Sequence, residues 1–262
     1  MILPTFQPQN PAISGCTLGW ASCTSFSTAM AGSYDRQVAK LVTGCAVRKA
    51  TGDTVGGTTL AQNDDALRSL TGVDLDTRYR LPWADFASKI NAGRGAVLQG
   101  WYQPIASSKF DAGGGFTGNH AIFVPPGWGA MDPLADGRRA GIYKYHGEAY
   151  PQSLLKAFAG RLNVAPIGYS ALGDGLVYAA FTRDNTKTYR ALLPTGAFWV
   201  YTVVSGRITG RTAQTRGGGS AVPCTGPRLY PWTGHSSKSL VMVTKGIYVG
   251  RYVSSQYAQE IP

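Results

Sequence analysis

The sequence contains few charged residues, few cysteines and few histidines. Charged side chains make up 15% of its 262 residues, and there are four cysteines and three histidines. No apolar run reaches eighteen residues, so we expect no membrane-spanning helix. The first residues include neither a basic nor an apolar region, which predicts no secretory signal. Four cysteines are too few for a disulfide framework. We therefore expect synthesis in a reducing cytoplasm and four free thiols, with Cys45 and Cys224 in different domains.

Apolar residues, in contrast, are plentiful. They make up 44% of the chain, which excludes a disordered protein and supplies a sizeable core. The 34 glycines and 15 prolines follow no period, so a collagen-like protein is also excluded. This composition favours a β or α+β protein with many loops. The length suits one domain of ordinary size joined to a smaller one.

Positive charge is concentrated in the last third of the chain. The formal net charge is +11, and residues 184–262 carry nine Lys or Arg against two Asp or Glu. Such a surplus indicates an anionic partner, which could be a nucleic acid, a cell-wall polymer or an acidic protein face. The alternative is a basic surface that only keeps the protein soluble.

The first part of the chain shows helical spacing before strand spacing. After an extended segment over residues 1–15, residues 23–44 predict one or two helices ended by Gly44, and further helices are expected over 59–72, 83–93 and 151–162. Strands are expected over 96–102, 120–124, 141–146 and 174–181. Helices followed by an antiparallel sheet are typical of the α+β class. We assign this domain to residues 1–183.

Only strand patterns remain over residues 184–262. Short alternating segments predict five strands, with tight turns at Ser205–Gly206 and Lys245–Gly246 that join pairs of them into hairpins. A Gly-rich stretch over 216–234 separates these hairpins. Five strands in a segment of this length predict a small all-β barrel.

One histidine lies in a context that suits catalysis. His120 begins a predicted strand, and Asp132 follows twelve residues later, after a turn rich in Gly and Pro. A strand, a turn and a return place a carboxylate beside an imidazole, where it fixes the tautomer and orientation of a general base. The alternative is a histidine satisfied at a strand end, with Asp132–Pro133 as an ordinary turn.

Cys23 is the candidate nucleophile. It stands at the expected N-terminus of the first long helix, where backbone N–H groups and the helix dipole lower the pKa of a thiol and donate to an oxyanion. The alternative is a small apolar residue buried in the helix. The order of cysteine, histidine and aspartate along the chain is that of papain-like enzymes.

Four segments carry a resemblance to a known family. They are CTSFSTAMA from Cys23, GGTTLAQNDDALRSLTG from Gly56, WADFASKINAGRGAVLQGWY from Trp83, and NHAIFV with the later MDPLA. In this order they resemble landmarks of papain-like cysteine peptidases of the bacteriocin-processing (double-glycine) type. The resemblance covers roughly residues 16–136. It implies a papain-like fold, with Cys23 as nucleophile, His120 as base and Asp132 as orienting acid.

The chain departs from this family in two respects. The family has a glutamine about six residues before its cysteine, as an oxyanion donor, but this position is Thr17. Gln9 and Asn10 instead precede Cys16 by about that distance, which makes Cys16 a rival nucleophile. In addition, the Gly-Pro that follows the family's cysteine is replaced by residues 24–25, Thr-Ser. These departures bear on activity more than on fold.

The basic tail resembles a barrel of the Src-homology-3-like, wall-binding kind. Its aromatic residues either stack on sugar rings or fill the barrel's core; they are Phe198, Trp199, Tyr201, Tyr230 and Trp232. Arg207, Arg211 and Arg216 make part of one face basic. No Cys/His zinc spacing, RNA-binding motif or phosphate-binding glycine pattern is found, so we expect no metal, no cofactor and no nucleic-acid partner.

Together these features predict a bacteriophage thiol peptidase or amidase that cleaves peptide bonds of peptidoglycan. It would be made in the host cytoplasm and act from the virion tail tip or during lysis, with its barrel on peptidoglycan or an anionic wall polymer. The alternative is a virion tail or baseplate protein that keeps a peptidase-like fold as a scaffold and contacts other tail proteins. Acyl transfer by the same three residues is a third hypothesis, since it also passes through an acyl-enzyme.

Overall fold

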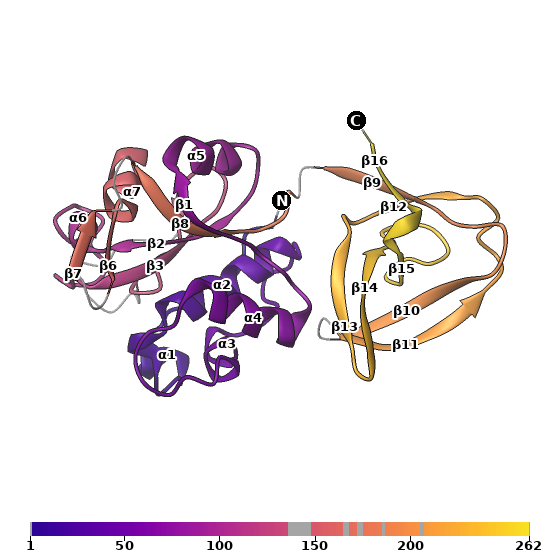
Figure 1. Cartoon of the computed structure of the whole chain (residues 1–262), viewed down its shortest axis with the longest axis horizontal. Coiled ribbons are helices and arrows are strands. Elements are labelled where there is room, and N and C mark those ends of the chain that lie inside the picture. Colours follow the sequence, from indigo (N-terminus) through magenta and orange to yellow (C-terminus); the bar gives the residue numbers. More distant parts are fainter. Residues whose placement is uncertain are drawn as a thin grey trace. The chain divides into compact units, whose positions relative to one another are not determined.

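The computed structural model describes residues 2–135, 148–164, 168–171, 175–184, 187–204 and 207–261. It combines helices with antiparallel sheets and a closed five-stranded barrel (Figure 1). The predicted α+β class with a small β-barrel is therefore confirmed. The chain divides into two compact units. The first comprises Met1–Leu67 and Leu75–Arg183, and the second comprises Arg68–Asp74 and Asp184–Pro262.

Short helices form the start of the chain, because small and apolar residues recur there at helical spacing. They are α1 (Pro11–Ser14), the 3-10 helix η1 (Gly19–Ala21), α2 (Cys23–Asp35), α3 (Gly44–Ala50) and α4 (Leu60–Thr71). Helix α2 is buried from Thr24 to its end. Its hydroxyl groups find partners inside the protein, since Ser33 Oγ donates to the carbonyl of Ala29 at 2.8 Å. This helix is the centre of the first unit.

A four-stranded antiparallel sheet packs against these helices. Its order is β1 (Asp76–Pro82), β8 (Leu176–Phe181), β2 (Ala96–Trp101) and β3 (Asn119–Val124). Helix α2 packs on β2 and β3, while α5 (Trp83–Asn91) and α7 (Gln152–Ala159) pack on β1, β2 and β8. Leu98, Ile122 and Phe181 belong to the core cluster under α5 and α7.

Smaller elements complete the first unit. Helix α6 (Gln103–Ala106) follows β2 directly. Strand β4 (Gly129–Ala130) pairs with β5 (Glu148–Ala149), and β6 (Arg161–Val164) pairs with β7 (Gly168–Ala171). These short pairs lie in the connections between β3 and β8.

The second unit contains a closed barrel and a small separate sheet. The barrel order is β10 (Phe198–Val204), β11 (Arg207–Gln214), β13 (Arg228–Trp232), β14 (His235–Met242) and β15 (Tyr252–Ser254). Strand β9 (Thr188–Leu192) pairs with β12 (Ala221–Cys224) and β16 (Ala258–Ile261) in a three-stranded sheet. Closure removes the exposed strand edges that promote aggregation.

Several predicted boundaries in the tail differ from the structure. The segment over 216–234, expected to be a loop, contains strands β12 and β13. The tight hairpin at Lys245–Gly246 is also wrong, because residues 243–251 form a longer connection between β14 and β15. Strand β1 was not expected either. The predicted strand over 141–146 and the turn at Ser205–Gly206 lie outside the described residues.

Gly44 starts a helix rather than ending one. Thr43 precedes α3 in an extended conformation, and its hydroxyl accepts from the backbone N–H of Ala46 at 3.1 Å, which is an N-cap. A side chain at position 44 would collide with the ring of Phe26, so glycine is required there by close packing against α2. The extended lead-in is likewise interrupted, since Asn10 caps the single turn of α1.

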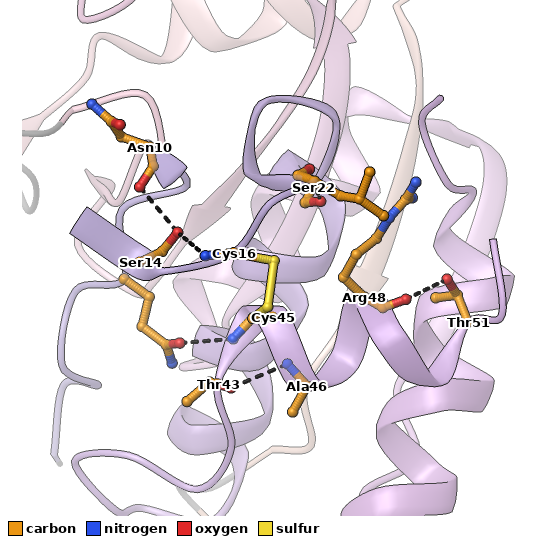
Figure 2. The surroundings of a disulfide bond; sticks show 12 residues. Asn10, Ser14, Cys16, Ser22, Thr43, Cys45, Ala46, Arg48 and Thr51 are labelled. Carbon is orange, nitrogen blue, oxygen red and sulfur yellow. Dashed lines mark hydrogen bonds between the residues drawn. A yellow bond between two sulfur atoms is a disulfide. The ribbon is translucent and has the colours of Figure 1, made fainter. Parts of the chain in front are cut away.

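The expectation of four free thiols is wrong. Cys16 and Cys45 form a disulfide, with their Cα atoms 5.5 Å apart (Figure 2). The bond links the segment between α1 and η1 to the first turn of α3. Cys23 and Cys224 are free. The prediction failed because the count of cysteines says nothing about which of them the fold brings together.

Candidate active site

Cys23 is the first residue of α2, and neighbouring polar contacts fix its position. Ser27, one turn later in the helix, donates its hydroxyl to the carbonyl of Ala121 at 3.0 Å. Gln99 of β2 donates to the hydroxyl of Thr24 at 3.3 Å. The start of α2 is therefore tied to both β2 and β3. Cys23 as a whole residue is intermediate between buried and exposed.

His120 and Asp132 meet across the turn that follows β3. Backbone hydrogen bonds join Phe123 and Met131 in both directions, at 3.1 and 2.8 Å, and bring the chain back alongside β3. His120 Nε2 then lies 2.7 Å from Asp132 Oδ1, and both side chains are almost completely buried. The strand, turn and return expected from the sequence thus place this carboxylate on the imidazole.

Asp132 is held by more than the histidine. The backbone N–H of Leu134 donates to Oδ1 at 2.9 Å, and the hydroxyl of Tyr102 donates to Oδ2 at 2.7 Å. The Tyr102 oxygen in turn accepts from the backbone N–H of Ala112 at 3.0 Å. Burial and the neighbouring Asp132 raise the pKa of Tyr102, so its hydroxyl stays protonated and donates. Both carboxylate oxygens therefore have partners.

Cys23 and His120 influence each other's ionisation. Burial alone raises the pKa of the Cys23 thiol. The charge of His120 and hydrogen bonding with His120 lower it, and together these effects outweigh burial, so the pKa of the thiol lies below its ordinary value. Burial lowers the pKa of His120, but Asp132 and Cys23 raise it to about 10. Since Asp132 occupies Nε2, the Nδ1 atom is left for the thiol. The pair favours a thiolate beside an imidazolium.

Gln9, rather than Thr17, lies close to the reacting groups. Its backbone N–H donates to the carbonyl of Pro133 at 2.9 Å, next to Asp132, and its Nε2 donates to the carbonyl of Trp20 at 3.2 Å. Gln9 is 2% exposed, whereas Thr17 is exposed. A side-chain amide thus contacts the segment just before α2, although it comes from a more distant part of the sequence than the glutamine of the family that the sequence resembles.

Two aromatic side chains remain partly open near the site. Phe116 is 41% exposed, and its ring centroid lies 5.8 Å from that of Tyr102 and 6.2 Å from that of His120. Trp20, three residues before Cys23, is 57% exposed. Large exposed rings next to buried polar groups are typical of ligand-contacting walls.

The structure separates the two cysteines that the sequence left as rivals. Cys16 is buried and bonded to Cys45, so it has no thiol to offer. Cys23, His120 and Asp132 are brought together. Tyr102 was missed by the sequence analysis, because a tyrosine after a strand is too common to stand out. Asn10 and Arg207 serve other purposes: Asn10 caps α1, and Arg207 donates to Ser69.

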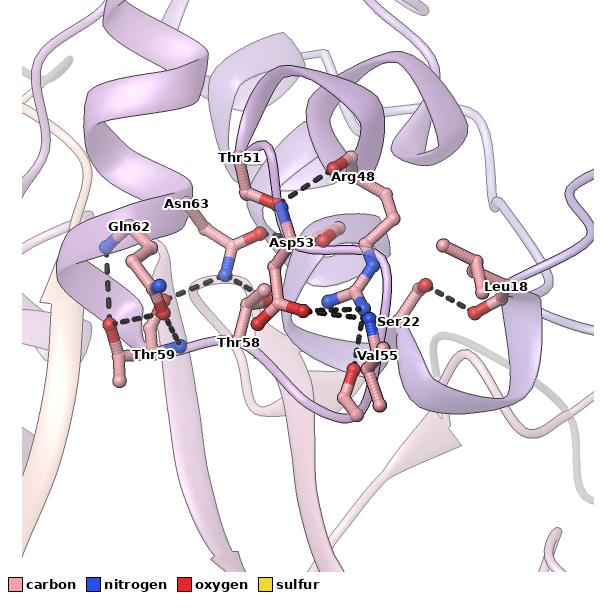
Figure 3. A network of polar contacts seen from close by, with 12 residues as sticks. Leu18, Ser22, Arg48, Thr51, Asp53, Val55, Thr58, Thr59, Gln62 and Asn63 are labelled. Carbon is pink, nitrogen blue, oxygen red and sulfur yellow. Dashed lines mark hydrogen bonds and ion pairs between the residues drawn. The ribbon is translucent and has the colours of Figure 1, made fainter.

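A polar network joins the start of α2 to α4 and to the connection between α3 and α4 (Figure 3). Ser25 donates to Asn63 Oδ1 at 2.6 Å, and Asn63 Nδ2 donates to the hydroxyl of Thr58 at 2.7 Å. The buried Arg48 donates to the carbonyl of Gly56 at 2.5 Å and lies 3.9 Å from Asp53. These contacts hold the Gly-rich connection between α3 and α4 against the helix that carries Cys23.

The described residues include no group of three metal-ligating side chains, and no helix in them is long and apolar enough to cross a bilayer. The candidate site brings together a thiol, an imidazole, a carboxylate and a tyrosine hydroxyl, a set that suits nucleophilic chemistry on a carbonyl. Comparisons of the chain with protein-family models, curated proteins and solved structures find no match.

Proposed function

We propose that the first unit is a papain-like thiol hydrolase, a peptidase or amidase. The observation that carries this proposal is the 2.7 Å contact between His120 Nε2 and Asp132 Oδ1, together with Cys23 at the N-terminus of α2, where His120 lowers the pKa of the thiol. A nucleophile, a base and an orienting acid in this order are the elements of covalent acyl chemistry.

The reaction would proceed in two halves. The Cys23 thiolate attacks the carbonyl carbon of an amide, forming a C–S bond and an oxyanion, to which the Cys23 backbone N–H and the helix dipole offer positive charge. His120 then gives its proton to the leaving amine as the C–N bond breaks. In the second half His120 takes a proton from water, and the resulting hydroxide releases the acyl group as a carboxylate. Asp132 keeps the imidazole oriented throughout.

The proposed substrate is the peptide part of peptidoglycan, and the proposed setting is a bacteriophage tail or lysis protein. Two features support this choice. The first is the resemblance of residues 16–136 to papain-like peptidases. The second is the basic barrel unit, with nine Lys or Arg against two acidic residues over 184–262, which suits a polymer such as an anionic wall component.

Incubation of peptidoglycan with the full chain tests this function. The wild-type chain should release new primary amines, Cys23→Ala should release none, and Cys224→Ser should release as many as the wild type. In parallel, alkylation of Cys23 by iodoacetamide reports the thiolate independently of any substrate.

The two readouts separate the parts of the proposal. A reactive Cys23 without amine release would refute peptidoglycan as the substrate. A Cys23 no more reactive than an ordinary thiol would refute the enzyme and favour the structural tail or baseplate role, for which the replaced Gly-Pro at residues 24–25 is the supporting feature.

A further inference from the structure

One face of the barrel carries an arginine stacked on indole rings. The guanidinium carbon of Arg211 lies 4.0 Å from the ring centroid of Trp199 and 5.2 Å from that of Trp232. On Trp232 the ring of His235 also stacks, with centroids 4.1 Å apart and planes inclined by 32°. We call these four residues, Trp199, Arg211, Trp232 and His235, the Trp–Arg patch.

Strand pairing explains why these side chains meet. In the β10–β11 pair, Arg211 lies opposite Tyr201 and Ala213 lies opposite Trp199, so Trp199 and Arg211 are diagonal neighbours on one face. Trp232 ends β13 and pairs with His235 across the turn to β14. The buried ring of Tyr201, opposite Arg211, lies 6.0 Å from that of Trp232 and perpendicular to it. The patch therefore rests on four strands of a closed barrel, β10, β11, β13 and β14.

The patch is exposed and positively charged. Arg211 and His235 are exposed, and Trp199 is 42% exposed. Within the described residues Arg211 makes ring contacts but no ion pair and no side-chain hydrogen bond. No Asp or Glu occurs between Asp184 and Glu260, and Glu260 is engaged by Lys187 at 2.8 Å. No carboxylate of the barrel strands therefore neutralises this arginine.

Stacking leaves the donors of Arg211 available. Indole faces hold the plane of the guanidinium, but its N–H groups point outward from the edges of that plane, where a carboxylate or phosphate binds in bidentate fashion. Because the plane is already held by Trp199 and Trp232, less side-chain freedom is lost when an anion binds. Arg211 is thus a prepared anion-binding group.

The aromatic rings favour a sugar over a nucleic acid. Single strands bind by stacking successive bases on open ring faces. Here His235 and Arg211 pack on Trp232 and Arg211 also packs on Trp199, so few ring faces remain open for successive bases. The indole of Trp199 is nevertheless 42% exposed, and this exposed part offers an apolar surface for one sugar ring directly beside the cation.

We propose that the Trp–Arg patch binds an anionic glycan, with Arg211 on a carboxylate or phosphate and Trp199 against the adjoining sugar ring. The proposal gives the wall polymer proposed above a chemical class, an anionic glycan, and names the residues of this chain that would bind it. It rests on that partner but does not require the peptidase activity.

Binding is measured by calorimetry on the full chain carrying Cys23→Ala, so that no turnover intervenes. Polygalacturonate supplies carboxylates on sugar rings, and a purified phosphodiester-linked wall polymer supplies phosphates, which distinguishes the two sources of charge. Dextran supplies sugar without charge, polyglutamate supplies charge without sugar, and oligodeoxythymidine supplies charge with bases.

Arg211→Gln should weaken binding of at least one anionic glycan by about tenfold or more, because a charge-assisted hydrogen bond is lost. Arg211→Lys should restore only part of it, because the ammonium keeps the charge without the planar stack. Trp199→Ala should also weaken it. The matched control is Arg190→Gln, an exposed side chain on β9 outside the barrel, which should change affinity less than about twofold. Unchanged thermal unfolding of each variant shows that the barrel is intact.

Four outcomes would overturn the proposal. They are no binding of either anionic glycan, equal losses in Arg190→Gln and Arg211→Gln, binding of dextran or polyglutamate as tight as that of the glycans, and tightest binding of oligodeoxythymidine. None of them bears on amine release by Cys23, so this proposal and the enzyme fail separately.

Discussion

Replacing Cys16 and Cys45 together by serine removes the disulfide that links the start of the chain to α3. The two cysteines are separated by 29 residues. In the chain-entropy description, closing a loop of that length stabilises the folded state by about 3.6 kcal/mol through its effect on the unfolded chain. For a domain of this size, such a loss lowers the melting temperature by roughly 7–14 °C.

Thermal unfolding followed by circular dichroism should show this decrease for the double serine variant and for the wild type with reductant. Cys224→Ser is the control and should melt like the wild type, since Cys224 is free. Titration of the denatured, unreduced wild type should count two thiols per chain. Four thiols, or a double variant that melts within about 1 °C of the wild type, would refute the disulfide and its contribution.

Three further results are expected near the site. Iodoacetamide at pH 7 should label Cys23 and spare Cys224, because His120 lowers the pKa of the first thiol, while burial raises the pKa of the second to about 11; equal labelling on mass spectrometry contradicts this. Tyr102→Phe should reduce kcat about tenfold at unchanged KM, since it removes a charge-assisted hydrogen bond to the carboxylate beside His120; an unaltered kcat would leave this tyrosine only a packing role. Phe116→Ala should raise KM at unchanged kcat if its half-exposed ring contacts the substrate, and a fall in kcat alone would argue against that contact.

Local signals in the sequence predicted part of the fold and of the site. Helical spacing places Cys23 at a helix start, and the turn between His120 and Asp132 is short enough to be inferred from the chain alone. Tyr102 reaches Asp132 from thirty residues away, and the partner of Cys16 depends on how α3 packs. Neither contact leaves a pattern within a short window of sequence.

In the tail, too, local sequence predicted some strands and missed those that depend on pairing between distant segments. Prolines in the segment over 216–234 argued against strands there, since proline lacks a backbone donor. Pro223 lies in β12, at the edge of its sheet, and Pro231 lies where the register between β13 and β14 shifts. Both are positions that tolerate proline. Edge and bulge positions depend on pairing between distant segments, which the local pattern does not contain.

The burial of His120, Asp132 and Tyr102 affects how selection acts on this fold. Their hydrogen bonds satisfy one another inside the protein, so losing any one of them leaves buried polar groups without partners and costs stability whether or not the protein is a catalyst. Cys23 lies outside these hydrogen bonds, so replacing its sulfur leaves none of these three side chains without its partner. Among related sequences, conservation of His120, Asp132 and Tyr102 is therefore explained by stability alone. Conservation of cysteine at position 23 would instead indicate selection for catalysis.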